Sequence, residues 1–342
     1  MNGLTTITAW IERNRWIWAA IGVFLLWMAL SLVASRFSLS SLSGVAVSSS
    51  FLLLVGIGQM LVVTTGRGNI DLSIPSVMTL SAYLALIIVH GQDSLLVPGI
   101  LAAVLLGLAA GLINAGLVVL LNIQAIIATL ATGYIFATGY VVANGFIPGF
   151  VTAPSLRYIA TQRLGPLPIV VIIAVLATAL ASYVLNRTAY GRTLSAVGQN
   201  IRAARLAGVR TGRVIATAFI ASSLIASMTG LLLGAYVGGA FLEMGQPYLL
   251  QSIGAVVLGG TLIFGGSATA LGTLFGSLLL VLIVTTMQIA GLPPGTQNVV
   301  QGVVIIAVLV LAGGMRLGRR LGPLARLRTR FATGSEGSAG GK

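Results

Sequence analysis

Long apolar stretches, separated by short polar turns, recur along almost the whole 342-residue chain. A transmembrane α-helix needs about 20 mostly apolar residues. Ten stretches approach this length, at residues 17–33, 44–65, 74–90, 97–121, 124–144, 168–186, 214–236, 249–264, 269–290 and 297–314. The pattern therefore predicts an all-α, polytopic integral membrane protein with about ten transmembrane helices. The run from Ser252 to Val284 also fits a re-entrant hairpin, so the helix count is open around 249–290.

The polar segments are too short to form a soluble domain. We expect a cytoplasmic N-terminus over residues 1–16, a single transmembrane domain over 17–314, and a basic, flexible cytoplasmic tail over 315–342. The first apolar stretch is longer than the ~7–15-residue core of a cleavable signal peptide, so it is predicted to be a retained helix.

Basic residues are distributed unevenly between the two sides of this topology. Lysine and arginine number 19 against 5 acidic residues, which gives a net charge of +14. If both termini are cytoplasmic, 16 basic residues face the cytoplasm and only Arg36, Arg157 and Arg163 lie outside. Positive charge concentrates on the cytoplasmic side of membrane proteins. The bias supports cytoplasmic N- and C-termini and accounts for the net charge without a nucleic-acid partner.

Composition excludes several kinds of catalytic site. The chain is 57% hydrophobic and 7% charged, has no cysteine and a single histidine, His90, and its only lysine is the last residue, Lys342. Without cysteine the chain cannot form a thiolate metal site, and without an internal lysine it cannot form a Walker A loop. A Ser-His-Asp triad could use no histidine other than His90. We expect no catalytic residue, no metal site and no cofactor in this chain.

The loop at 187–213 is the most distinctive polar segment. It holds six arginines, and Asn200 followed by a short apolar-basic run predicts a small amphipathic helix that ends at Gly208. Such a helix has two uses: it can lie on anionic membrane lipid, or it can insert its apolar face into a groove of a partner protein. Spacing alone leaves both uses open.

Four segments of the chain resemble one transporter family. Residues 190–209, YGRTLSAVGQNIRAARLAGV, resemble the cytoplasmic loop of permease subunits in ribose/galactose/xylose-type ABC importers. Residues 58–77 are similar to that family's G-x-x-x-V-x-x-x-G-G-I-D-L-S-V-G-S block, and 255–266 to its A-V-V-L-G-G-x-x-x-x-G-G block. Residues 122–132 are similar to K-I-x-P-F-I-x-T-L-x-T. The likeness keeps order and spacing from about residue 50 to 314.

The chain departs from the family pattern at a few positions. Arg67 and Asn69 stand around the glycines of the first block, Pro75 stands where glycine is usual, and Gln124-Ala125 replaces a proline-aromatic pair. These segments lie near the translocation path in the family. The departures therefore concern substrate preference more than architecture.

The resemblance implies a permease subunit of a binding-protein-dependent ABC importer in the bacterial inner membrane. The implied solute is a monosaccharide or a similar polyhydroxylated molecule. Implied partners are an identical or paralogous second permease subunit, a cytoplasmic ATPase that binds ATP and Mg, and an external sugar-binding protein. The 187–213 loop becomes the ATPase-coupling loop, and the matched positions are Gly198, Asn200, Ala203, Ala204, Arg205 and Gly208.

Polar residues inside apolar runs are candidates for the translocation path. They are Gln59, Asp71, Asn114, Thr129, Gln251 and Asn298. A polyol needs neutral hydrogen-bonding partners because an unpaired, desolvated hydroxyl costs about 1–3 kcal/mol. Polar residues in membranes also hold helices together. For Asp71 two interpretations stay open: a cap for the helix that begins near Ile74, and a wall of the pathway.

Two further patterns bear on contacts and packing. Arg157, Arg163 and Glu243, which are predicted to lie outside, are candidate contacts for the binding protein. The small-xxx-small spacing of Gly107 with Gly111, and of Gly230, Gly234 and Gly238, predicts close helix packing.

Two other functions compete with the importer subunit. An ion-coupled secondary transporter needs buried ionisable or cation-coordinating groups, and only Asp71 qualifies. A passive channel for a small polar solute would leave the basic loop without a role.

Overall fold

The computed structural model describes residues 16–33, 39–146, 152–307 and 310, and these are mostly helical. The helices are α2 (Trp16–Val33), α3 (Leu39–Thr64), α4 (Ile74–Val89), η1 (Asp93–Leu95), α5 (Leu96–Ala115), η2 (Gly116–Leu120), α6 (Ala125–Asn144), α7 (Pro154–Thr161), α8 (Ile169–Arg187), α9 (Ala189–Gln199), α10 (Ile201–Leu206), α11 (Thr211–Val237), α12 (Tyr248–Leu258) and α13 (Ala270–Ile289). A last helix covers 294–307. The N-terminal segment predicted over 1–16 lies outside the described residues except for Trp16, which begins α2, and the tail predicted over 315–342 lies outside them entirely.

Six of the described helices are long and apolar enough to cross a membrane, which supports a multi-pass membrane protein. The apolar helices Trp16–Met28, Ile74–Val89 and Tyr248–Leu258 are shorter. At 1.5 Å per residue, α12 rises only about 16 Å, about half of the bilayer's hydrocarbon core. The stretch predicted at 249–264 is therefore a short helix followed by a loop. Helix α12 packs against α13, which is itself long and apolar enough to cross a membrane.

Helix α3 is the centre of the bundle. It packs against α8, α11, α12 and α13. Within α3, 89% of the most apolar stretch of 18 residues is buried. The most apolar stretches of the same length in α5 with η2 and in α8 are only 28% buried, so most of their apolar side chains face outward. This contrast is expected for a membrane bundle, in which lipid covers the outer helices.

Close contacts between helices depend on glycine. A Cβ on Gly111 of α5 would lie 2.5 Å from Ile220 Cα of α11, and one on Gly107 would lie 2.8 Å from Leu224 Cα. A Cβ on Gly230 would overlap the backbone of Met78 in α4. The predicted small-residue packing is confirmed at these sites. It is wrong at Gly238, which has open space around it and ends α11 with a φ of +81°.

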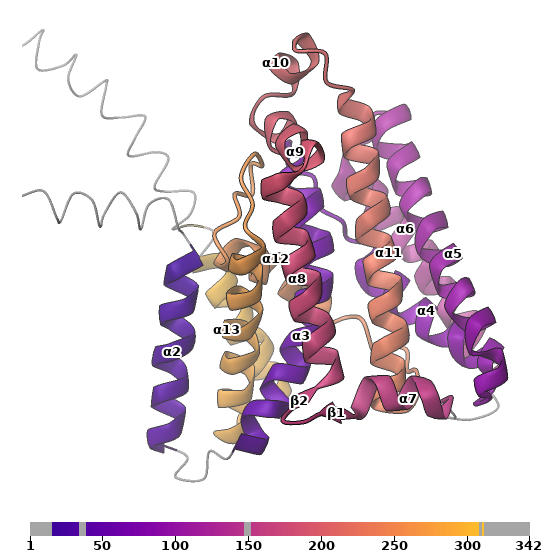
Figure 1. The fold of residues 1–342 in the computed structure, drawn as a ribbon, viewed down its shortest axis with the longest axis vertical. Coiled ribbons are helices and arrows are strands. Elements are labelled where there is room, and N and C mark those ends of the chain that lie inside the picture. The colour runs from indigo at the N-terminus through magenta and orange to yellow at the C-terminus, as the bar shows by residue number, and fades with distance from the viewer. Residues whose placement is uncertain (1–15, 34–38, 147–151, 308–309, 311–342) are drawn as a thin grey trace, which may run out of the picture.

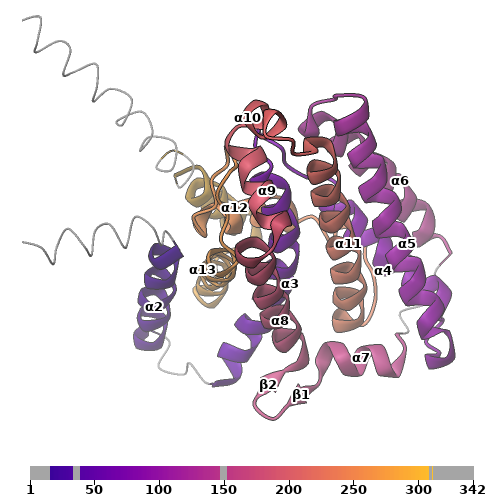
Figure 2. The same ribbon diagram turned by 45° about the horizontal axis from the view of Figure 1, so that its top comes forward.

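The described bundle has two distinct ends. Figures 1 and 2 show α9 and α10 at one end, which we call the α10 end, and α7 with the hairpin β1 (Arg163–Leu164) and β2 (Leu167–Pro168) at the other, the α7 end. Neither α7, the hairpin nor α9 is evident from the apolar pattern, because all three are short and of mixed polarity. Helix α11 runs from one end to the other, with contacts to both α10 and α7.

Candidate functional site

A cluster of buried polar side chains occupies the interior where α3 ends and α4 begins. We call it the polar cluster, and each member is at most 2% exposed. Its members are Gln59, Asp71, Ser73, Asn114, Thr129, Thr132 and Ser222. They come from α3, the 65–73 loop, α5, α6 and α11, so the cluster links four helices of the bundle.

Asp71 is the centre of the polar cluster. Its Oδ1 accepts hydrogen bonds from the Ser73 backbone N–H (3.0 Å) and the Ser73 hydroxyl (2.6 Å). Its Oδ2 accepts one from the Ser222 hydroxyl of α11 (2.8 Å). These three donors pair both oxygens of the Asp71 side chain, so neither buried oxygen is left without a partner. Asp71 therefore makes an Asx-type turn before α4 and a cross-link to α11; Arg67, which is exposed, is not among its partners.

The hydrogen bonds continue from Ser73 through two more helices. Asn114 Nδ2 of α5 donates to Ser73 Oγ (2.8 Å), and Thr132 Oγ1 of α6 donates to Asn114 Oδ1 (2.6 Å). The Leu72 N–H donates to Thr129 Oγ1 (3.0 Å). Buried polar networks of this kind hold a specific arrangement because each lost partner leaves a costly unpaired group.

Gln59 joins the polar cluster from α3 through one side of its amide. The Asp71 N–H donates to Gln59 Oε1 (3.3 Å), while Gln59 Nε2 is buried without a hydrogen-bond partner among the described residues. A buried unpaired amide is destabilising by about 1–3 kcal/mol. Within the polar cluster, Gln59 Nε2 is therefore a donor that can still form a hydrogen bond.

Two of the family departures fit this local structure. Asn69 is buried, and its Nδ2 donates to Thr65 Oγ1 (2.8 Å) within the loop. Pro75 lies in the first turn of α4, where a backbone N–H has no helical partner and proline is well tolerated. Non-helical backbone at membrane depth is stable only where protein or a cavity surrounds it, and the buried residues of this loop meet that condition.

The structure brings together four of the six residues that the sequence indicates for the path: Gln59, Asp71, Asn114 and Thr129. The other two lie apart. Gln251 of α12 is half-buried and donates to Gln301 Oε1 (2.8 Å), and Asn298 is exposed. Sequence reasoning missed Ser222, although adjacent serines in an apolar stretch are a usable signal.

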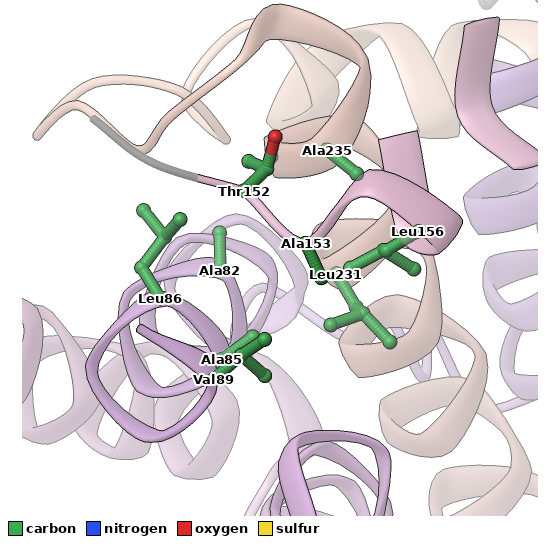
Figure 3. A pocket seen from close by; sticks show the side chains of 10 residues that line it. Ala82, Ala85, Leu86, Val89, Thr152, Ala153, Leu156, Leu231 and Ala235 are labelled. Atoms are coloured by element: carbon green, nitrogen blue, oxygen red, sulfur yellow. The ribbon is translucent and has the colours of Figure 1, made fainter. Parts of the chain in front are cut away.

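A pocket near the α7 end is not suited to be the translocation path for a polyol. It lies between α4, α11 and the start of α7, and its wall is almost entirely carbon (Figure 3). Its volume is about 10 Å³, which is about the space of one water molecule. It is too small and too apolar for a polyol.

The loop predicted at 187–213 forms two helices at the α10 end. As predicted, Asn200 caps α10: its Oδ1 accepts from the N–H groups of Arg202 (3.1 Å) and Ala203 (3.0 Å). Gly208 follows the helix with a φ of +82°, a conformation that favours glycine and ends the helix. The preceding α9 is capped by Thr188 and buries Leu194 and Val197 against the bundle.

The residues of α10 divide into an inward and an outward set. Ala204 is only 5% exposed and packs on the bundle, so it supports α10 from below rather than offering a contact. Ala203, Arg205 and Gly208 are exposed, and Leu206 is 90% exposed. Gly198 is only half-buried, but its Cα lies against the end of α3.

A hollow beside α10 is basic. It is open, has a volume of about 530 Å³, and is lined by Arg67, Ile201, Arg202, Arg205 and Leu206. The described chain contains three acidic residues, and none lies here: Asp71 is in the polar cluster, Asp93 accepts from the Ser155 N–H at α7, and Glu243 follows α11. Among the described residues, the hollow therefore presents positive charge without an acidic partner, with the apolar side chain of Leu206 at its edge.

Asn200→Ala tests the cap that shapes this surface. Loss of an N-cap costs about 1 kcal/mol. This is a large fraction of the free energy that holds a six-residue helix folded. We expect amide hydrogen exchange over 201–206 to become severalfold faster, while exchange in α11 is unchanged. Asn200→Asp keeps the acceptor and serves as the matched control. Equal exchange in wild type and Asn200→Ala would show that the cap does not hold α10.

The candidate contacts at the opposite end are exposed. Arg157 lies on α7, and Arg163 on β1 donates through Nη2 to Ser43 Oγ of α3 (2.7 Å). Glu243 lies in the exposed part of the loop after α11. That loop then enters the bundle, where the Gly245 N–H donates to Thr79 Oγ1 of α4 (3.0 Å).

Comparison with known proteins decides the family. Residues 41–309 match the family described as "Branched-chain amino acid transport system / permease component". The chain belongs to this permease family. The resemblance seen in the four sequence segments is thereby confirmed, and the protein is a transport permease component rather than an enzyme.

The relatives of this permease include autoinducer-2 import permeases. It is 32% identical over 312 residues to the "Autoinducer 2 import system permease protein LsrC" of Photorhabdus luminescens, which covers 90% of this chain and 92% of the relative. It is 30% identical over 332 residues to the protein of that name from Escherichia coli O157:H7, with 94% of each chain covered. No solved structure matches the permease significantly.

Proposed function

We propose that the permease is the transmembrane subunit of a binding-protein-dependent ABC importer for a monosaccharide-like, polyhydroxylated solute. The observation that carries the proposal is the family match together with relatives that import autoinducer-2. About ten spans, both termini in the cytoplasm and a place in the bacterial inner membrane belong to the same proposal. Seven of the nine described arginines lie at the α10 end, and the positive-inside rule supports a cytoplasmic location for that end.

The α10 end is the docking surface for the ATPase in this proposal. The exposed Leu206 inserts into a groove of the ATPase, and Arg67, Arg202 and Arg205 pair with its carboxylates. Arginine suits this role because its planar fork binds carboxylates through two hydrogen bonds. Arg67 lies outside the coupling loop, so the 65–69 turn is part of the same surface.

The polar cluster and the α7 end supply the other parts. A second permease subunit completes the path, with the polar cluster as its closed wall and Gln59 Nε2 as the free donor for a hydroxyl. The external binding protein docks on α7 and the β1–β2 hairpin, where Arg157 and Arg163 are exposed. ATP and Mg bind to the ATPase, and this chain needs no cofactor.

Reconstitution provides the decisive measurement. Proteoliposomes containing the permease, its ATPase and its binding protein should accumulate labelled autoinducer-2 or D-ribose against a gradient only when ATP is inside. Permease alone should accumulate neither. Uphill accumulation without the ATPase, driven by a proton or sodium gradient, would replace the importer subunit with a secondary transporter, and downhill leakage alone would indicate a channel.

A further inference from the structure

Four glycines join three distant segments of the permease directly beneath α10. Gly66 follows α3, Gly198 lies near the end of α9, and Gly265 and Gly266 lie in the loop between α12 and α13. We call this contact the glycine joint.

The backbones in the glycine joint touch without side chains between them. A Cβ on Gly198 would overlap the carbonyl oxygen of Thr64 and the backbone of Gly266, and one on Gly66 would lie 2.8 Å from the carbonyl oxygen of Gly198. A Cβ on Gly265 would overlap the backbone of Gly66. Any side chain at these positions would collide with the neighbouring backbone, so only glycine fits. Three of the four glycines also have a φ between +80° and +84°, which favours glycine.

Hydrogen bonds fix the three segments in register. The Gly266 N–H donates to the carbonyl oxygen of Thr64 (3.0 Å), and Gln199 Nε2 donates to the carbonyl oxygen of Gly266 (3.2 Å). A displacement of α9 and α10 therefore cannot occur without moving the end of α3 and the 259–268 loop, or breaking these bonds.

The glycine joint is also close in sequence to the polar cluster. Gly66 accepts from the Asn69 N–H (3.0 Å), and Asn69 precedes Asp71 by two residues in the same buried loop. The short segment between Thr64 and Ser73 thus connects the underside of α10 to bonds that reach α5, α6 and α11.

We infer that Gly198 and Gln199 are positioning residues for transport: they convert movement of the ATPase-docking helix into movement of α3 and of the α12–α13 loop. This inference rests on the proposed function and deepens it, because it assigns Gly198 to the interior joint rather than to the ATPase surface. Packed, hydrogen-bonded elements of this kind carry coupling between distant sites when they have two discrete arrangements.

The test compares Gly198→Ala with Gly116→Ala. A Cβ on Gly116 would meet nothing within 4 Å, so that variant controls for the added methyl group. We expect Gly198→Ala to bind the ATPase with wild-type affinity but to import about 10- to 30-fold less solute per ATP hydrolysed, the upper range of measured coupling effects. D-Ribose and autoinducer-2 are the probes. Weaker docking in proportion to the lost import would overturn the inference.

Gln199→Ala keeps the inference testable if Gly198→Ala does not fold. It removes the hydrogen bond to Gly266 without adding atoms, and we expect about a 2- to 5-fold lower import per ATP. A folded Gln199→Ala protein with the wild-type ratio would overturn the inference.

A distance measurement separates this inference from the proposed solute. The chain has no cysteine, so spin labels enter the permease only at Phe264→Cys and Leu164→Cys, both exposed and at opposite ends. Mixing labelled with excess unlabelled permease leaves the distance within one subunit as the one measured. With ATPase bound, a non-hydrolysable ATP analogue should shift this distance in wild type and not in Gly198→Ala. A shift without import of either probe would refute the proposed solute alone. An equal shift in both proteins would refute the glycine joint.

Discussion

Asp71→Ala should lower the stability of the permease more than any other single change in the polar cluster. The substitution leaves the Ser73 N–H, the Ser73 hydroxyl and the Ser222 hydroxyl without their acceptor inside the bundle. A buried donor left without its acceptor costs about 1–3 kcal/mol, and such costs do not add fully. We expect a loss of about 3–4 kcal/mol, read as a thermal midpoint lowered by several degrees in detergent and as lost import.

Asp71→Asn separates geometry from charge. An amide oxygen can accept both bonds from Ser73, and the amide nitrogen can donate to the Ser222 hydroxyl. The loss should therefore be about 1 kcal/mol or less, with most import retained. Asp93→Ala is the surface control, since its exposed carboxylate accepts a single backbone N–H, from Ser155. A folded Asp71→Asn protein that imports as poorly as Asp71→Ala would show that the charge itself is required.

Leu206→Glu should abolish productive contact with the ATPase while leaving the permease folded. A fully buried leucine contributes about 1.5–3 kcal/mol at an interface, which corresponds to a 10- to 100-fold change in affinity. The charge also repels the carboxylates that we expect opposite Arg205. Binding of the ATPase to permease in nanodiscs measures the loss, and thermal unfolding should be unchanged because the side chain is 90% exposed.

Two comparisons make that result specific. Leu164→Glu places the same charge on an exposed leucine at the α7 end and should leave ATPase binding unchanged. Ala204→Glu buries a carboxylate under α10, so it should lower thermal stability and weaken docking together. If Leu206→Glu bound the ATPase as tightly as wild type, α10 would not be the docking helix.

Sequence alone predicted the features that depend on local pattern. The apolar stretches correspond to helices, and α10 was predicted from its cap residue and its terminal glycine because both act within a few residues. Helix α9 was missed, since its two glycines and low hydropathy give a weak helical signal; its stability comes from Leu194 and Val197 packing on the bundle. The end of α12 at Leu258 was missed because the following loop is equally apolar.

The polar cluster and the glycine joint could not be predicted from local pattern. Ser222 is 151 residues from Asp71, and only the fold brings them within hydrogen-bonding distance. Sequence could mark Gln59, Asp71, Asn114 and Thr129 as polar residues in apolar surroundings, but not show that they bond to one another. Gly198 matched the family's loop, yet its contact partners are in two other segments.

One rigid element reaches from the neighbourhood of the hairpin to the glycine joint. Helix α3 spans 26 residues, or about 39 Å; Arg163 of β1 binds Ser43 near its start, and Gly66 follows its end. A binding protein that docks on the hairpin and an ATPase that docks on α10 would therefore both act on helix α3. Thermodynamic reciprocity then requires that each ligand change the affinity of the other by an equal factor.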